Sequence, residues 1–218
     1  MRRAIRFILV LVAAAGLGAC GGGRPIRYYT LELPPSPEPS TNAYPITVLL
    51  GRIGAPEILQ DEPVAYRLGA NEIGTYDYHH WVEPPVRLVK VMLIRQLRAS
   101  GKYQSVAELG SSTQGQFVLQ GRLYDFEEVD SGSTTALVTM EFELHDRRTG
   151  QTVWSHFYSH SEPVQGKEIS DVVSALDRNL ERGLAEVTSG LDGYFSANAP
   201  RRPEPKASLD SSNSREHS

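Results

Sequence analysis

Two segments of the chain carry apolar residues at helical spacing. The first begins at Pro84-Pro85 and stops at Gly101, and its apolar positions are Val86, Val89, Leu93 and Leu97. The second runs for about six turns, with Ile169, Val172, Val173, Leu176, Leu180, Leu184, Val187 and Leu191 at its apolar positions. Apolar residues three or four positions apart share one side of a helix, and proline is tolerated in a first helical turn. We therefore predict two long amphipathic helices.

Between these helices, residues 117–160 alternate between apolar and polar side chains, which is typical of half-buried strands. Two runs with hairpin-loop composition interrupt the alternation: Asp130-Ser131-Gly132-Ser133 and Arg147-Arg148-Thr149-Gly150. The pattern predicts a three-strand antiparallel meander. If both loops close symmetrically, the apolar residues of the strands coincide in cross-strand rows. One row holds Leu123, Met140 and Phe157, another holds Leu119, Leu144 and Val153, and Gly121 lies opposite Phe142.

The same register places a second set of side chains on the opposite face of the meander. Its three rows are Arg122, Glu141 and His156; Gln120, Glu143 and Trp154; and Tyr124, Thr139 and Tyr158. One interpretation is a solvated face stabilised by cross-strand charge pairs. The other is a partner-binding surface formed by Trp154, Tyr158 and Tyr124, with Phe126, because aromatic residues and arginine are frequent interface anchors. On that interpretation, another protein chain or a second layer of the same chain covers the face.

Shorter extended segments before the first helix complete the predicted sheet: residues 28–31, 46–50, 64–68 and 73–78. The expected fold class is α+β, a small antiparallel sheet with both long helices packed on one face. The globular domain is expected over residues 43–197. Residues 20–42 before it contain the first strand and a proline-rich linker, and the polar tail 198–218 is expected to be disordered.

The N-terminus has the organisation of an export signal. Arg2, Arg3 and Arg6 precede a short apolar run, and Leu17-Gly18-Ala19-Cys20 resembles the site at which bacterial lipoprotein signals are cleaved. The apolar run is too short to span a bilayer. We therefore expect residues 1–19 to be a signal peptide and Cys20 to be lipidated, with palmitate among the acyl chains. An ordinary signal that happens to end before a cysteine is the alternative.

The sequence context of Cys20 favours the lipidated form. Cys20 is the only cysteine, so it has no partner for an internal disulfide in an oxidising compartment. Gly21, rather than an aspartate, follows it. Gram-negative lipoproteins are sorted by the residue that follows the lipidated cysteine, and aspartate there is the signal for the inner membrane. Glycine therefore predicts the periplasmic face of the outer membrane in preference to the inner membrane.

Charge and motifs exclude several functions. Loss of the three signal arginines would leave 19 basic residues against 26 acidic ones, which argues against nucleic acid binding. No catalytic motif is present, and the row of Arg122, Glu141 and His156 is typical of structural pairing, so no enzyme activity and no cofactor are predicted. His79 and His80 are adjacent, and neighbouring side chains of a strand point to opposite faces. No metal site is therefore predicted.

Three further motifs occur in a recognisable order. Tyr28-Tyr29-Thr30-Leu31 comes first, Tyr66-Arg67 follows, and the last is Tyr76-Asp77-Tyr78-His79-His80-Trp81-Val82-Glu83-Pro84-Pro85. With the expected lipidation site, this order resembles the ABC-type transport auxiliary lipoprotein family, which includes the PqiC lipoproteins. The resemblance covers about residues 28–191, nearly all of the expected folded part.

The resemblance implies a non-enzymatic, membrane-anchored periplasmic component of an ABC-type lipid transport system. Its implied partners are an MCE-domain protein and the membrane components of the transporter, with a homo-oligomer left open. Trp81 is then interpreted as the anchor of the crossing into the first helix, or, with His79 and Tyr78, as part of a docking surface. Two other functions remain open: a lipid carrier, which requires a large apolar cavity, and an envelope or outer-membrane assembly lipoprotein.

Overall fold

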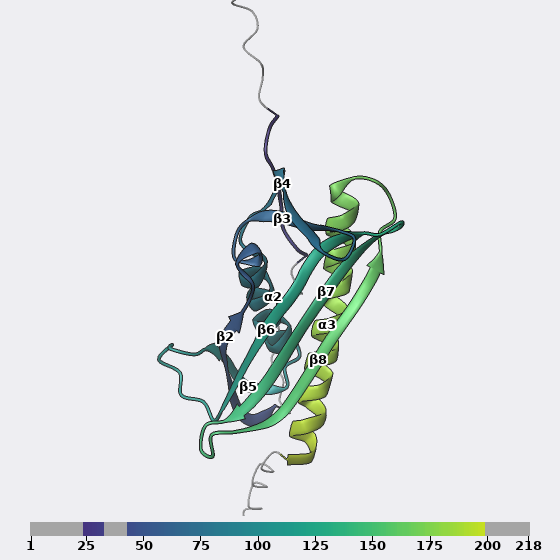
Figure 1. The fold of residues 1–218 in the computed structure, drawn as a ribbon. Helices are drawn as coiled ribbons and strands as arrows, with labels where there is room; N and C mark the ends of the chain where they lie inside the picture. The colour runs from purple at the N-terminus through teal and green to yellow at the C-terminus, as the bar shows by residue number, and fades with distance from the viewer. Residues whose placement is uncertain (1–23, 33–42, 199–218) are drawn as a thin grey trace, which may run out of the picture.

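The computed structural model describes residues 24–32 and 43–198; the predicted signal peptide, Cys20, the proline-rich linker and the C-terminal tail lie outside this part of the chain (Figure 1). The described residues form one eight-stranded sheet with two α-helices on one of its faces. In chain order, the elements are β1 (Arg27–Tyr29), β2 (Tyr44–Gly54), a 3-10 turn η1 (Glu57–Leu59), β3 (Pro63–Leu68), β4 (Glu72–Trp81), α2 (Pro85–Ala99), β5 (Tyr103–Glu108), β6 (Phe117–Asp130), β7 (Thr134–Asp146), β8 (Gln151–Pro163) and α3 (Ile169–Asn198).

Strand β6 organises the sheet. It pairs with β7 along one edge, while its other edge pairs with β2 in the first half and with β3 in the second half. β5 continues the sheet beyond β2, and β4 and then β1 continue it beyond β3. The predicted mixture of helices and strands is confirmed, and the meander and both hairpin loops are present.

The sheet is larger than predicted, and it is mixed rather than antiparallel. β2 runs parallel to both β5 and β6, β3 runs parallel to β6, and β1 runs parallel to β4. β5 directly follows α2, and a helix between two strands allows the chain to return in the same direction. β1, which the sequence analysis placed ahead of the globular domain, is an edge strand of the same sheet.

The predicted register between β6 and β7 holds along the first half of β6. Leu119 faces Leu144, Leu123 faces Met140, and Gly121 faces Phe142. A Cβ atom at Gly121 would lie 2.5 Å from Cδ1 of Phe142, so the glycine provides the space that the ring occupies. A β-bulge at Tyr124 then shifts the register, so that Thr139 pairs with Asp125 instead.

The predicted register between β7 and β8 is wrong beyond the hairpin. The loop closes as expected, with Asp146 opposite Gln151, but an irregularity at Val153 absorbs one extra residue. Leu144 therefore pairs with Trp154, and Met140 pairs with Tyr158. A shift of one residue moves each side chain of a strand to the other face. Trp154 and Tyr158 consequently face the helices, and Phe157 faces the opposite side.

The core fills the space between the sheet and the helices. α2 buries Leu88, Val89, Met92, Leu93 and Leu97, and α3 buries every residue of its predicted stripe except Ile169, which is half-buried. α3 packs on β7 and β8, and a Cβ atom at Gly183 would lie 2.4 Å from Cε of Met140. None of the described helices combines the length and apolar composition that crossing a bilayer requires.

Candidate functional site

The helices leave one face of β6, β7 and β8 uncovered (Figure 1). That face carries an exposed aromatic pair. Phe157 is 60 % exposed and Tyr124 is 37 % exposed, and their ring centroids are 6.4 Å apart. The guanidinium carbon of Arg122 lies 5.4 Å from the Tyr124 ring centroid. The Tyr124 hydroxyl donates a 2.8 Å hydrogen bond to Glu141. We call Arg122, Tyr124, Glu141 and Phe157 the open-face cluster.

The hydrogen bond and the bulge explain how this cluster is held. The hydrogen bond to the Glu141 carboxylate raises the pKa of the Tyr124 hydroxyl, because ionisation would place a second negative charge beside the first. A β-bulge re-aims side chains locally. At the bulge of β6, the Tyr124 ring is directed over the neighbouring strand β7 towards Phe157 on β8. The cluster offers apolar area, a cation and an acceptor at one place, which suits protein recognition.

Of the four aromatic residues predicted on this face, only Tyr124 is exposed there. Tyr158 is buried, and Trp154 is half-buried against α3, where a Cβ atom at Gly190 would lie 2.8 Å from Cζ2 of its indole. Their predicted position on the outer face is therefore wrong. His156 also faces the helices, with Nε2 3.3 Å from Glu186, so the predicted row of Arg122, Glu141 and His156 is not formed. Phe157 was missed because the bulge at Val153 has no sequence signal.

The two remaining predicted contact residues, Trp81 and His79, lie at the end of β4. Trp81 is fully buried, its rings are centred 5.4 Å from the Phe126 ring, and its backbone N–H donates to the Glu62 carbonyl at 2.7 Å. This is the position of a core anchor ahead of α2. Phe126, which the predicted register also placed on the outer face, is buried with it.

His79 is half-buried beside β1. Its Nδ1 lies 2.8 Å from the Tyr29 hydroxyl, and the two rings stack with centroids 5.8 Å apart. Burial lowers the pKa of His79, and the nearby positive charges of Arg27 and Arg24 lower it further. At neutral pH the imidazole is therefore uncharged, and it takes part in aromatic packing rather than in charge pairing.

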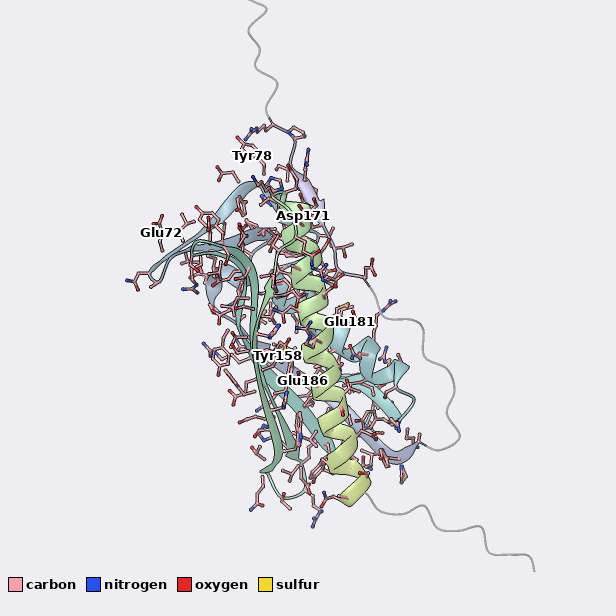
Figure 2. The ribbon with its side chains drawn as sticks, turned by 90° about the vertical axis from the view of Figure 1, so that its right-hand side faces the viewer. Glu72, Tyr78, Tyr158, Asp171, Glu181 and Glu186 are labelled. Carbon is pink, nitrogen blue, oxygen red and sulfur yellow. The ribbon has the colours of Figure 1, made fainter. Side chains whose placement is uncertain are left out.

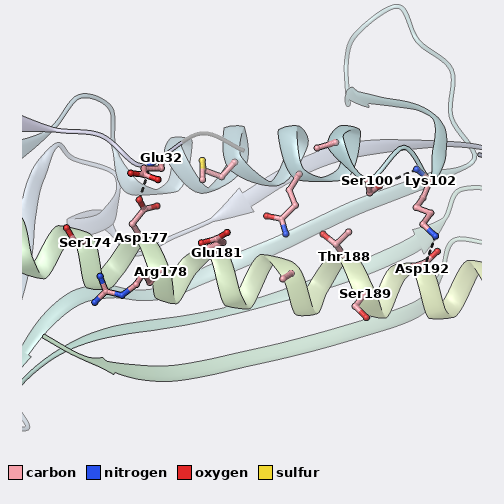
Figure 3. A pocket seen from close by; sticks show the side chains of 14 residues that line it. Glu32, Ser100, Lys102, Ser174, Asp177, Arg178, Glu181, Thr188, Ser189 and Asp192 are labelled. Carbon is pink, nitrogen blue, oxygen red and sulfur yellow. Dashed lines mark hydrogen bonds and ion pairs between the residues drawn. The ribbon is translucent and has the colours of Figure 1, made fainter. Parts of the chain in front are cut away.

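A groove of about 880 Å³ separates α2 from α3 (Figure 3). At one end, the backbone N–H of Glu32 donates a 3.0 Å hydrogen bond to Asp177, and at the other end Lys102 pairs with Asp192 at 3.5 Å. Burial raises the pKa of Asp177 despite the hydrogen bond from Glu32. The groove is open to solvent, and charged side chains line it beside apolar ones, so it is not an enclosed apolar cavity for an acyl chain.

An ion pair that the sequence analysis did not identify lies beside the open-face cluster. The Arg67 guanidinium contacts Glu127 at 2.5 Å and Asp125 at 3.4 Å. Glu127 is buried, and burial raises the pKa of its carboxyl group although Arg67 opposes this. Arg67 is thus a structural partner of a buried carboxylate. Within the described residues, no group of three histidine, cysteine or acidic side chains is placed to hold a metal ion.

Comparison with solved structures shows the same fold in distant relatives. The crystal structure of protein XCC0632 from Xanthomonas campestris, a DUF330 protein, superposes with a TM-score of 0.69 at 18 % identity and covers 78 % of this chain and 98 % of that one. The crystal structure of an uncharacterized protein superposes with a TM-score of 0.61 at 17 % identity, over 77 % and 99 % of the two chains. Comparison with curated protein sequences gives no match.

The family comparison covers most of the chain. The model of the ABC-type transport auxiliary lipoprotein component family matches residues 29–188, which include every strand and helix from β2 to β8 and most of α3. The match contains the Tyr-Arg pair and the segment from Tyr76 to Pro85, on which the sequence resemblance was based. The chain belongs to the ABC-type transport auxiliary lipoprotein component family.

Proposed function

We propose that this protein is a lipid-anchored periplasmic subunit of an ABC-type lipid transport system, and that it acts by docking with an MCE-domain protein. The anchor is Cys20, and the proposed location is the periplasmic face of the outer membrane. Membership of the transport auxiliary family supports the link to a transporter. The observation that carries docking is the open-face cluster, because Phe157 is 60 % exposed on a sheet face that no described element covers.

The open face has the composition of an interaction surface. Phe157 and Tyr124 supply rigid aromatic area, and Arg122 supplies a cation that already contacts an aromatic ring. Strand β8, which contributes Phe157 to the cluster, pairs only with β7 among the described strands. An unpaired edge of 13 residues offers backbone donors and acceptors to an extended segment of a partner.

Packing favours docking over lipid carriage. A carrier would need an apolar cavity between the sheet and the helices, but that space is filled by side chains such as Leu123, Met140 and Leu184, none of which is exposed. The large groove lies between the helices, and it is lined by Asp177, Glu181 and other polar residues. An acyl chain in this groove would remove water from those charged side chains, which is costly.

The test is a mild-detergent pull-down of the tagged full chain from its own membranes, with mass spectrometry of co-purifying proteins and lipids. We expect recovery of an MCE-domain protein without stoichiometric lipid on the isolated subunit. Phe157→Asp should reduce that recovery at least about tenfold, as expected for an interface anchor. Val91→Asp is the matched control, since Val91 is 42 % exposed on α2, in the layer behind the sheet.

Each other outcome identifies a different function. A partner-free monomer that carries lipid would establish the carrier alternative. Recovery of outer-membrane barrel machinery would establish the envelope-assembly alternative. Equal recovery of the MCE-domain protein by wild type and Phe157→Asp would leave the partner in place and reject the open face as its docking surface.

A further inference from the structure

The end of the molecule at which the described chain begins displays a group of exposed apolar and aromatic side chains. Tyr28 is 60 % exposed, Val82 49 %, Ile26 47 % and Tyr78 41 %. These four residues, which we call the β1–β4 tip, come from two paired strands and the residues next to them. Single exposed apolar residues are ordinary, whereas several at one place indicate an interaction surface.

Pairing between β1 and β4 brings the tip together. The two strands run parallel, with Arg27 opposite His79 and Tyr28 opposite His80, so Ile26 and Tyr78 each lie one residue before the first pair. The Tyr28 and His80 rings are in edge contact, with centroids 6.0 Å apart. The backbone N–H of Val82 donates a 2.8 Å hydrogen bond to the Tyr29 carbonyl, which places Val82 beside the end of β1.

An irregularity in β4 explains why Tyr78 protrudes. Pro63 pairs with His80 and Ala65 pairs with Thr75, so four residues of β4, 76–79, lie opposite the single residue Val64. Such an excess forces the longer strand to bulge. Tyr76 and His79 pack against each other at the base of the bulge, with ring centroids 5.8 Å apart. Tyr78 instead points out at the end of the molecule where the chain enters (Figure 2).

Charged side chains of both signs surround the tip. Arg24 and Arg27 are exposed, and both lie close enough to His79 to lower its pKa. Asp77 and Glu168 are also exposed there, and Glu83 is paired with Arg87 at 3.6 Å. Phospholipid headgroups themselves combine phosphate with ammonium or hydroxyl groups. Tyrosine is enriched at this level of a bilayer because its ring is apolar and its hydroxyl is polar.

The anchor fixes how far the tip can lie from the bilayer. Only three residues separate Cys20 from Arg24. A chain extends by at most about 3.6 Å per residue, so Arg24 lies within about 14 Å of Cys20 whatever path the intervening residues take. Acyl chains on Cys20 would hold that residue at headgroup level. The β1–β4 tip therefore cannot stand far from the membrane surface.

We infer that the β1–β4 tip is a membrane-contact surface that sits in the headgroup layer of a phospholipid bilayer. Ile26, Tyr28, Tyr78 and Val82 enter the interface, and Arg24 and Arg27 contact phosphates. The contact adds a second attachment to the lipid anchor and sets the orientation of the molecule. The β7–β8 loop then lies away from the membrane, at the opposite end of the sheet and near the C-terminal end of α3 (Figure 1). α3 itself extends about 45 Å for its 30 residues.

The inference rests on the lipid anchor of the proposed function, and one experiment separates the two. Cys20 is the only native cysteine, so in the lipidated full chain an introduced cysteine is the only free thiol. Tyr78→Cys and Val82→Cys place a fluorophore at the tip, and Arg148→Cys places it in the exposed β7–β8 loop. Each labelled chain is reconstituted into phosphatidylethanolamine and phosphatidylglycerol vesicles that contain a lipid with a nitroxide quencher on its headgroup.

We expect one label per chain, about a twofold or greater quenching at positions 78 and 82, and little quenching at position 148, because only the tip reaches the interface. One label per chain with equal, weak quenching at all three positions would overturn the membrane contact while leaving the anchor intact. Two labels per chain would show that the Cys20 thiol is free, and would overturn the anchor together with the inference.

Discussion

The hydroxyl of Tyr158 donates a 2.6 Å hydrogen bond to Oδ1 of Asn179, joining β8 to α3 inside the core. The Asn179 side chain is buried, and its Nδ2 donates to the carbonyl oxygens of Ala136 at 2.8 Å and His160 at 2.7 Å. One amide thus connects α3 to both β7 and β8. This relationship exists because the bulge at Val153 turns Tyr158 towards the helix.

Asn179→Ala should lower the free energy of unfolding by about 3 kcal/mol, because it removes three hydrogen bonds inside the core. The Tyr158 hydroxyl keeps its second acceptor, the backbone carbonyl of residue 179 at 3.1 Å. Urea denaturation followed by circular dichroism measures this. Ser189→Ala, at an exposed position on the same helix, should change stability by no more than about 0.5 kcal/mol. Equal effects of the two substitutions would contradict the connecting role of Asn179.

Two glycines of α3 should respond in opposite directions to alanine. Gly183→Ala should destabilise the protein by about 1–3 kcal/mol through overpacking, because the new methyl group would lie 2.4 Å from Cε of Met140 and 2.8 Å from the Tyr158 ring. Gly193 has no described atom within 4 Å of its Cβ position, so Gly193→Ala should stabilise the helix by up to about 1 kcal/mol. Thermal unfolding of both variants checks the difference in sign.

Tyr103 should contribute to a loss of stability at alkaline pH. Its hydroxyl is buried without a hydrogen-bond partner among the described residues, and burial, with the charge of Asp192 adding, raises its pKa. In the unfolded chain a tyrosine ionises near pH 10, so above that pH the folded state holds more protons and stability falls as pH rises. Tyr103→Phe should be neutral or stabilising by about 1 kcal/mol at pH 7.

The same substitution should reduce the fall in stability between pH 7 and pH 11. Urea midpoints at the two pH values measure it, and an unchanged alkaline fall in Tyr103→Phe would reject the assignment to this residue.

Arg67→Met should destabilise the protein by about 2 kcal/mol at pH 7, because it leaves the buried Glu127 carboxylate without its cation. Arg67 retains some contact with water, which keeps the effect below that of a fully buried pair. The pKa of Glu127 is already raised by burial, and loss of Arg67 raises it further. Stability then falls as pH rises through that pKa, so the defect should shrink in acid.

The double variant Arg67→Met, Glu127→Gln provides the control. Removal of both charges should recover most of the stability at pH 7, since the glutamine carries no charge to bury. A double variant as unstable as Arg67→Met alone would show that the arginine acts through its packing rather than through its charge.

Local patterns were sufficient for the elements themselves. The apolar spacing of α2 and α3, the alternation of β6 and β7, and the loops at residues 131–133 and 147–150 all depend on side chains close in sequence, and the structure has each of them. The parallel pairing of β2 with β5 and β6 joins segments far apart in the chain, and no local pattern specifies it. This is why the predicted sheet was too small and purely antiparallel.

The candidate surface depended on a single residue of register. The apolar and polar residues of β8 fit either register, so the sequence could not show that the strand contains one extra, unpaired residue at Val153. In the structure, Phe157 is therefore exposed on the outer face, and Trp154 and Tyr158, which were predicted there, face the helices. Tyr124 lies on the predicted outer face because the predicted register of β6 with β7 holds as far as Leu123. The bulge changes the pairing only after that residue.

By itself, the sequence determined the family, the helices and the hairpins, because these follow from short-range periodicity and from motifs such as Tyr66-Arg67 and Trp81 with Pro85. Only the tertiary structure decided which side chains face the helices and which face outwards. That choice depends on bulges at Tyr124 and Val153, and on close contacts such as Gly183 with Met140, which arise when distant segments pack together.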